Sequence, residues 1–211
     1  MMNRNTIRVL IIENQILTRV GIRTILSEQS DIEIVGEAET SEEGFRLFCS
    51  LKPQVTLISL RLPESCAVDE IERFLAENKR GRIIVLADQA GDAEVSRSLK
   101  RGAFGYVCKD VSADDLVKAI HTVGAGRKYI QSEVANILSE NFGQEELTRT
   151  EQKILQMIVG GNSNKEIAYD LKVSENTVKT HVKNVFEKLG VSDRTSAATL
   201  AIKRGLVRID V

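Results

Sequence analysis

The stretch SENTVKTHVKNVFEKLG, residues 174–190, decides how the C-terminal part of this chain folds. Its apolar residues recur at steps of three and four, the spacing that lines one face of a helix. Ser174 offers an N-cap hydroxyl, and Gly190 tolerates the left-handed conformation in which helices end. The stretch therefore predicts one complete amphipathic helix. Its apolar face contains Val178, Val182, Val185 and Leu189. Its outer, polar face contains Asn176, Lys179, Thr180, Lys183 and Glu187.

A second, shorter helix is predicted immediately before this one. Ser163 and Glu166 have the spacing of a capping box, in which each side chain bonds the other residue's backbone N–H. This helix ends at Lys172, and Val173 makes the turn, so the two helices must cross at a steep angle. In a helix-turn-helix, the first helix lies across the nucleic-acid backbone and the second enters the major groove. The pattern therefore favours a DNA-binding module over a generic helical bundle.

Two more helices complete a predicted all-α domain of residues 147–211. One begins at a second capping box, Thr148 with Glu151, and the other begins at an Asp193 cap. Four short helices around one apolar centre form a compact unit. A lysine-rich surface is usually only a solvated one, but beside a helix-turn-helix it favours DNA. The lysines in question are Lys172, Lys179, Lys183 and Lys188.

Composition is typical of a two-domain protein without a membrane span. The 211 residues are long for one domain and sufficient for two. The 29 basic and 30 acidic residues nearly balance, so attraction to DNA must come from a local patch. Cys49, Cys66 and Cys108 lie far apart and match neither a disulfide nor a zinc framework. No apolar run is long enough for a bilayer, and no signal peptide is apparent. We expect a cytoplasmic protein that needs no metal or cofactor.

The first half of the chain alternates short apolar runs with amphipathic segments. The runs lie at residues 7–12, 32–38, 55–59, 83–86 and 104–108. Continuous apolar strands separated by helices indicate a parallel sheet that is covered on both faces. They predict an α/β, flavodoxin-like, doubly wound sheet of five strands in the order 2-1-3-4-5. This domain is expected over residues 5–124, followed by a linker over 125–146 with an added helix over 132–141.

Two motifs in the first half and one long motif in the second half resemble a known family. They are PQVTLISLRLP and KRGAFGYVCKD, and then LTRTEQKILQMIVGGNSNKEIAYDLKVSENTVKTHVKNVFEKLGVSDRT. The whole chain resembles a bacterial response regulator of the NarL/FixJ type, with a receiver domain and a LuxR-type helix-turn-helix. The third motif is highly specific, whereas the receiver motifs are altered.

The alterations fall on the pocket in which this family is phosphorylated. In the family, an acidic pair after the first strand and an aspartate after the third hold a divalent cation, and the aspartate accepts the phosphoryl group. Here the resemblance places one carboxylate and an amide at the acidic pair, and serine at the acceptor. Mg²⁺ prefers carboxylate ligands, and serine cannot form an acyl phosphate. We predict a pseudo-receiver with a degenerate pocket of Glu13, Asn14, Ser59, Ala87, Tyr106 and Lys109.

Several readings of this pocket remain open from the sequence. Lys109 could turn to Glu13, hydrogen-bonded to Ser59, and lock the domain in one conformation, or it could point to solvent. Ser59 could be the target of a serine kinase, or its hydroxyl could only form a hydrogen bond with a backbone group. Cys66 and Cys108 flank the pocket and are either part of a redox switch, which would need a low thiol pKa, or small buried hydrophobic residues. Tyr106, which swings in the family, is either fixed or part of the core packing.

By the same resemblance, the outer face of the recognition helix reads DNA. Lysine suits the O6 and N7 acceptors of guanine, and the threonine methyl group suits thymine. Helix N-termini suit phosphates, because their backbone N–H groups point outward. A homodimer on paired half-sites is expected, with contact through residues 197–202 or between receivers. The predicted base contacts are Lys179, Thr180 and Lys183, and the predicted backbone contacts are Asn164, Lys165, Ser174, Asn176, Thr177 and His181.

Three functions follow from these observations. The first is a sequence-specific transcription regulator that is controlled by dimerisation, abundance, a partner or a ligand, without aspartyl phosphorylation. The second is a conventional regulator phosphorylated at a non-standard acceptor. The third is an interaction or sequestering protein, against which the intact capping boxes and basic face argue. No nucleophile–base pair and no phosphate-binding glycine loop appear, so the chain is not predicted to be an enzyme.

Overall fold

A computed structural model describes residues 6–63, 65–140 and 145–207, which form two compact units. The first contains most residues up to Asn136, and the second contains Ile137–Val211. Helix α6 (Ser132–Glu140) crosses this division and lies where the sequence predicted an added helix. The predicted helix end at Asn141 and the domain limits at residues 5 and 211 lie outside the described residues.

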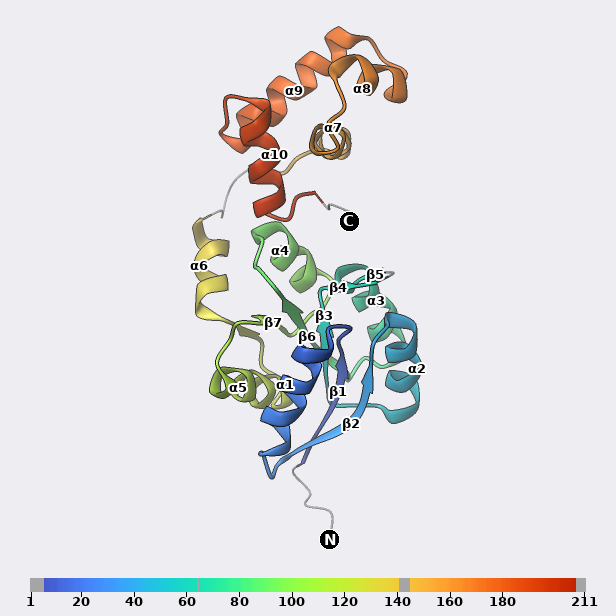
Figure 1. Ribbon diagram of the computed structural model, residues 1–211, viewed down its shortest axis with the longest axis vertical. Helices are drawn as coiled ribbons and strands as arrows, with labels where there is room; N and C mark the ends of the chain where they lie inside the picture. The colour runs from blue at the N-terminus through green and yellow to red at the C-terminus, as the bar shows by residue number, and fades with distance from the viewer. Residues whose placement is uncertain (1–5, 64, 141–144, 208–211) are drawn as a thin grey trace. The chain divides into compact units, whose positions relative to one another are not determined.

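The first unit is built on a parallel sheet (Figure 1). Its strand order is β2-β1-β3-β6-β7-β8, so the predicted order 2-1-3-4-5 is confirmed for the first five strands. The sheet has one strand more than predicted, because a two-residue strand in the expected linker pairs with β7. The strands are β1 (Ile7–Ile12), β2 (Ile32–Ala38), β3 (Val55–Ser59), β6 (Arg82–Ala87), β7 (Gly105–Cys108) and β8 (Tyr129–Ile130).

Helices cover both faces of this sheet, as the unbroken apolar strands predicted. Helices α1 (Ile16–Ser27) and α5 (Ala113–Gly124) pack on one face, and α2 (Ser41–Leu51) and α3 (Ala67–Glu77) lie on the other (Figure 1). Helix α4 (Asp92–Lys100) connects β6 to β7.

Helix α2 packs closely against the sheet. A Cβ on Gly44 would lie 2.4 Å from Ile12 Cδ1, so only glycine lets α2 approach β1 this closely.

A small hairpin, which the sequence did not predict, follows the third strand. Strands β4 (Arg61–Leu62) and β5 (Ser65–Cys66) pair in antiparallel fashion. Ala67 N–H then donates to Leu60 O at 3.0 Å, which leads the chain into α3. This hairpin lies next to the end of β3 and shapes the pocket there.

Residues 145–207 form four helices, as predicted. Two buried clusters hold them together: one joins α7 and α10 to the C-terminal half of α9, and the other joins α7 and α8 to its N-terminal half. The recognition helix therefore rests on both clusters along its length. The helices are α7 (Arg149–Val159), α8 (Asn164–Leu171), α9 (Glu175–Leu189) and α10 (Arg194–Lys203).

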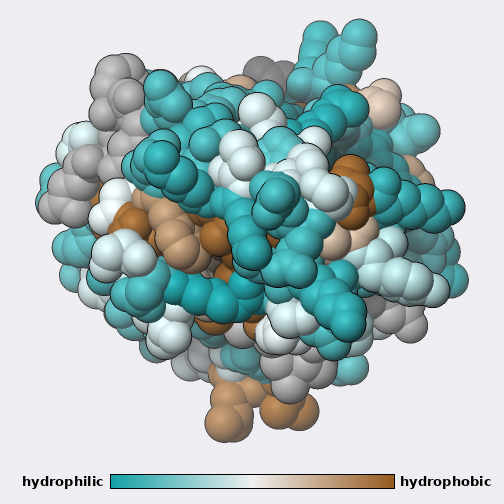
Figure 2. Space-filling view, turned by 90° about the horizontal axis from the view of Figure 1, so that it is seen from above, coloured by the Kyte–Doolittle hydropathy of each residue, from teal (hydrophilic) through white to brown (hydrophobic). Residues whose placement is uncertain are grey.

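Polar side chains cover most of the surface in view, with separate small apolar patches (Figure 2). The large apolar side chains that are exposed in the described residues are Ile16, Leu17, Val20, Tyr169, Val173 and Ile202. Three of these six lie in the first half of α1, which makes that part of α1 an apolar surface. No helix in the described part of the chain is long and apolar enough to cross a bilayer.

Candidate functional site

The recognition helix α9 is fixed at both ends by the residues that the sequence indicated. Ser174 Oγ accepts a hydrogen bond from Thr177 N–H at 3.1 Å, and Gly190 adopts the left-handed conformation with φ of 67°. Val178, Val185 and Leu189 are buried. These contacts determine which side of the helix is turned outward.

Helix α8 and the turn complete the helix-turn-helix. Glu166 N–H donates to Ser163 Oγ, and Ser163 N–H donates to Glu166 Oε2 at 2.6 Å, so the predicted capping box is present. Three residues separate α8 from α9. The first of them, Lys172, takes the left-handed conformation with φ of 55°, which ends α8 and turns the chain toward α9.

The outer face of α9 presents the predicted base-reading side chains to solvent. Lys179, Thr180 and Lys183 are exposed, and Thr180 Oγ1 donates to Asn176 O at 3.1 Å. Of the predicted backbone contacts, Lys165, Ser174, Asn176 and Thr177 are exposed, and Asn164 and His181 are half-buried. All six lie at the start of α8, at the N-cap of α9 or in the first half of α9. The structure therefore gathers all nine predicted DNA contacts on two adjoining helices.

Lys188 does not belong to this surface, contrary to the expectation for the four lysines. Its Nζ lies 2.9 Å from Glu151 Oε2 and also donates to Glu146 O at 3.3 Å. Burial alone would raise the pKa of Glu151, but hydrogen bonds from Lys188 and Thr148 hold that pKa below its usual value. The carboxylate is therefore ionised at neutral pH and binds Lys188 against α7.

The second site lies at the carboxyl ends of four neighbouring strands of the sheet. Strand register aligns Ile12 with Ile58, Ser59 with Leu86, and Ala87 with Cys108. The residues after or at these strand ends therefore meet along one edge. They are Glu13, Ser59, Ala87 and Lys109, four of the six pocket residues that the sequence predicted.

A buried ion pair occupies the centre of this pocket. Lys109 Nζ lies 2.9 Å from Glu13 Oε2, and the two side chains are 9% and 0% exposed. The prediction that Lys109 turns to Glu13 therefore holds, and the alternative in which it points to solvent is wrong. Lys109 Nζ also lies 3.5 Å from Asp88 Oδ1, an acidic neighbour that sequence reasoning missed.

Ser59 does not join this pair, contrary to prediction. Its hydroxyl donates to Arg61 O at 3.1 Å, within the turn that leads into the hairpin. With its amide turned so that the nitrogen faces the neighbouring acceptors, Asn14 donates to Arg61 O at 3.1 Å and to Glu13 Oε1 at 3.2 Å. Ser59 is fully buried, so a serine kinase could reach it only after local unfolding.

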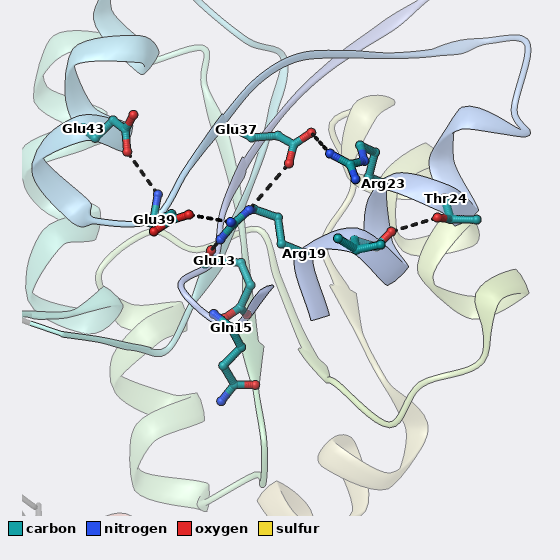
Figure 3. A network of polar contacts seen from close by, with 9 residues as sticks. Glu13, Gln15, Arg19, Arg23, Thr24, Glu37, Glu39 and Glu43 are labelled. Carbon is teal, nitrogen blue, oxygen red and sulfur yellow. Dashed lines mark hydrogen bonds and ion pairs between the residues drawn. The ribbon is translucent and has the colours of Figure 1, made fainter. Parts of the chain in front are cut away.

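A second polar network, centred on Arg19, holds the loop that carries Glu13 (Figure 3). Arg19 donates to Glu13 O, and its guanidinium lies 2.6 Å from Glu39 Oε1 and 3.6 Å from Glu37 Oε2. Gln15 N–H donates to Glu13 Oε1 at 2.8 Å. Arg19 thus ties the end of β1 to the end of β2. The sequence gives little sign of this role, because Arg19 is only one of two arginines in the helix over residues 16–27.

The other pocket residues are consistent with structural roles. Tyr106 is fully buried in β7. Cys66 is buried, and burial together with the carboxylates of Asp110, Glu133 and Asp88 raises the pKa of the Cys108 thiol. A raised pKa disfavours the thiolate, which is the form that reacts. The Cys108 thiol therefore lacks the low pKa that a redox switch requires.

Two family models match the chain. Residues 9–121 match the response regulator receiver domain, and residues 145–201 match the bacterial regulatory proteins of the luxR family. The chain belongs to the LuxR/NarL-type response regulators. A transcriptional regulatory protein, MctR from Rhizobium johnstonii, is 36% identical over 210 residues, which cover 98% of each chain. The nitrate/nitrite response regulator NarL from Escherichia coli is 32% identical and aligns over 94% of this chain and 96% of its own length.

Solved structures give the same result for this LuxR/NarL-type regulator. A structure of two RcsB dimers bound to two parallel DNAs has a TM-score of 0.74 and is 25% identical, covering 94% of this chain and 99% of that one. The match extends over both units. The sheet unit is therefore the receiver of the family, and the four-helix unit is its helix-turn-helix domain.

Proposed function

We propose that this DNA-binding transcriptional response regulator recognises a specific duplex sequence as a homodimer and is controlled without aspartyl phosphorylation. The single observation that carries this proposal is the Lys109–Glu13 ion pair. It fills the pocket in which other members of the family carry a metal ion and a phosphoryl group. Dimerisation, protein abundance, a partner or a ligand would then set the activity of the protein.

The residues at the pocket do not fit a divalent cation. Both Glu13 oxygens are already engaged: Oε1 accepts from Gln15 N–H, and Oε2 faces the Lys109 ammonium. A hard cation needs oxygen ligands, usually including one or two carboxylates. The Asp88 side chain is largely exposed, and its Oδ1 lies 3.5 Å from Lys109 Nζ. Among the described residues, no group of three or more His, Cys, Asp or Glu side chains could hold a metal ion.

The ion pair would also stabilise one conformation of this receiver. A buried carboxylate is stable only with a compensating charge, so moving Lys109 away from Glu13 carries a large free-energy cost. Arg19 adds to this by holding the Glu13 loop to β2. The receiver would then act as a fixed scaffold for assembly. The alternative is that a residue other than aspartate is phosphorylated, and a phosphorylation experiment distinguishes the two.

That test is treatment of the full chain with acetyl phosphate and Mg²⁺, followed by intact-mass measurement. We expect no gain of the mass of one phosphoryl group under conditions that label a conventional receiver. A stable adduct mapped to the pocket would overturn the proposal and favour the conventional regulator. A Lys109→Ala variant serves as a control, because a vacated pocket without an acceptor aspartate must also remain unlabelled.

Two surfaces support a dimer on DNA. The first half of α1 exposes Ile16, Leu17 and Val20, and α10 exposes Ile202. Single helix-turn-helix domains cover little DNA, so pairs of them on half-sites about one helical turn apart are the usual arrangement. RcsB, a relative in fold and sequence, is a dimer on DNA.

Analytical ultracentrifugation of the chain on a duplex with two half-sites tests this assembly. We expect two chains per duplex at saturation, with the second chain binding more tightly than the first. Saturation at one chain per duplex would contradict the dimer. Failure of every duplex to be retained specifically would contradict sequence recognition itself and would favour an interaction or sequestering role.

A further inference from the structure

The recognition helix carries a carboxylate beside each lysine that is proposed to read bases. Lys179 Nζ lies 3.2 Å from Glu175 Oε1, and Lys183 Nζ lies 3.6 Å from Glu187 Oε1. Each pair spans four residues, so each joins successive turns of the outer face. The Lys183 and Glu187 side chains are 76% and 64% exposed, so both are open to solvent among the described residues. In the free protein, both lysines therefore have a carboxylate partner on their own helix.

Helix stability explains Glu175 but not Glu187. Glu175 lies in the first turn of α9, where the macrodipole favours an acid, and it precedes its lysine, which is the better order. Glu187 lies three residues before Gly190, which donates its N–H to Glu187 O. An acid in the last turn opposes the macrodipole, and an acid that follows its lysine makes the weaker pair. Helix stability therefore does not account for an acidic residue at position 187.

The chemistry of the pair suggests another reason for Glu187. A lysine donates to guanine O6 and N7, whereas a carboxylate accepts from the exocyclic amine of cytosine. Four residues of helix advance about 6 Å, close to two base-pair steps of about 3.4 Å. A lysine and a glutamate one turn apart on the same face are therefore spaced to read a guanine and a nearby cytosine.

We propose that Glu187 is a specificity-determining residue that reads a cytosine one or two base steps from the guanine read by Lys183. Off DNA, the two side chains hold each other. On the operator, the two side chains separate, and each forms a hydrogen bond with its own base. On other sequences, the Glu187 carboxylate faces phosphates or base acceptors without a donor, which disfavours binding. This inference rests on the proposed function, because it requires that α9 enters the major groove.

The test is selection of bound duplexes from a randomised pool by the full chain and by a Glu187→Gln variant. Glutamine pairs with adenine N6 and N7, so we expect the preferred base at one position to change from cytosine to adenine. Affinity for random duplex should rise by about threefold to tenfold at low salt, because one repulsive charge is removed, and this gain should shrink as salt is added. A Glu187→Ala variant should lose the preference at that position without gaining adenine.

Asp170→Asn is the matched control, because it makes the same charge change at an exposed position of α8. It should leave every base preference unchanged. If the wild-type chain selects a sequence and Glu187→Gln selects the same one, the inference about Glu187 is wrong while the proposed function stands. If the wild-type chain selects no sequence, the proposed function itself fails.

Discussion

Replacing Lys109 by methionine is expected to lower the free energy of unfolding of the receiver by about 3–5 kcal/mol. Methionine keeps most of the side-chain volume but removes the ammonium that lies 2.9 Å from Glu13. The Glu13 side chain is completely buried, so water cannot replace that ammonium. The cost arises from an uncompensated buried charge rather than from a cavity. Urea unfolding of the full chain measures this loss of stability. Hydrogen exchange of β1 and β7 peptides shows whether the loss falls on the sheet.

A double variant separates the ion pair from simple packing. Glu13→Gln with Lys109→Met removes both charges and should be more stable than Lys109→Met alone. Lys118→Met is the matched control, because Lys118 is an exposed lysine on α5, and it should change stability little. The lock requires an effect on function too, so DNA affinity of the Lys109 variant should also change. If neither stability nor DNA affinity changes, the pair does not hold the receiver in one state.

Lys183→Ala is expected to weaken operator binding by about 1–3 kcal/mol, roughly a fivefold to 150-fold loss. Lys183 is exposed and its partner Glu187 is solvated, so the variant should fold like the wild-type protein. The loss should be concentrated at one base pair of the operator, because a guanine contact carries sequence information. Fluorescence anisotropy with the operator, with operators changed at single positions, and with random duplex measures this pattern.

Lys165→Ala is the contrasting variant, because Lys165 lies at the start of α8 and is proposed to bind phosphate. It should lower affinity for all duplexes to a similar extent and reduce the salt dependence. Equal losses for operator and random duplex in the Lys183 variant would remove Lys183 from the base-reading set. It would then join Lys165 as a backbone contact.

Local sequence determined most of the C-terminal domain. Capping boxes, a glycine stop and apolar spacing act over three to seven residues, so the sequence by itself predicted the boundaries of α8 and α9 closely. The same is true of the strand order in the receiver, because buried parallel strands read as unbroken apolar runs. The short strand β8 escaped prediction because two residues carry no periodic signal.

The pairing of charges was decided only by tertiary structure. Lys188 resembles the other lysines in the sequence, yet packing of α9 against α7 places it beside Glu151, which is 37 positions away. Asp88 approaches Lys109, and Arg19 approaches Glu39, only because neighbouring strands end at the same edge of the sheet. Ser59 turned to Arg61 because a hairpin that the sequence did not predict presents a carbonyl there. Residue types set which partners a charged side chain can take, whereas the fold sets which of them lies within reach.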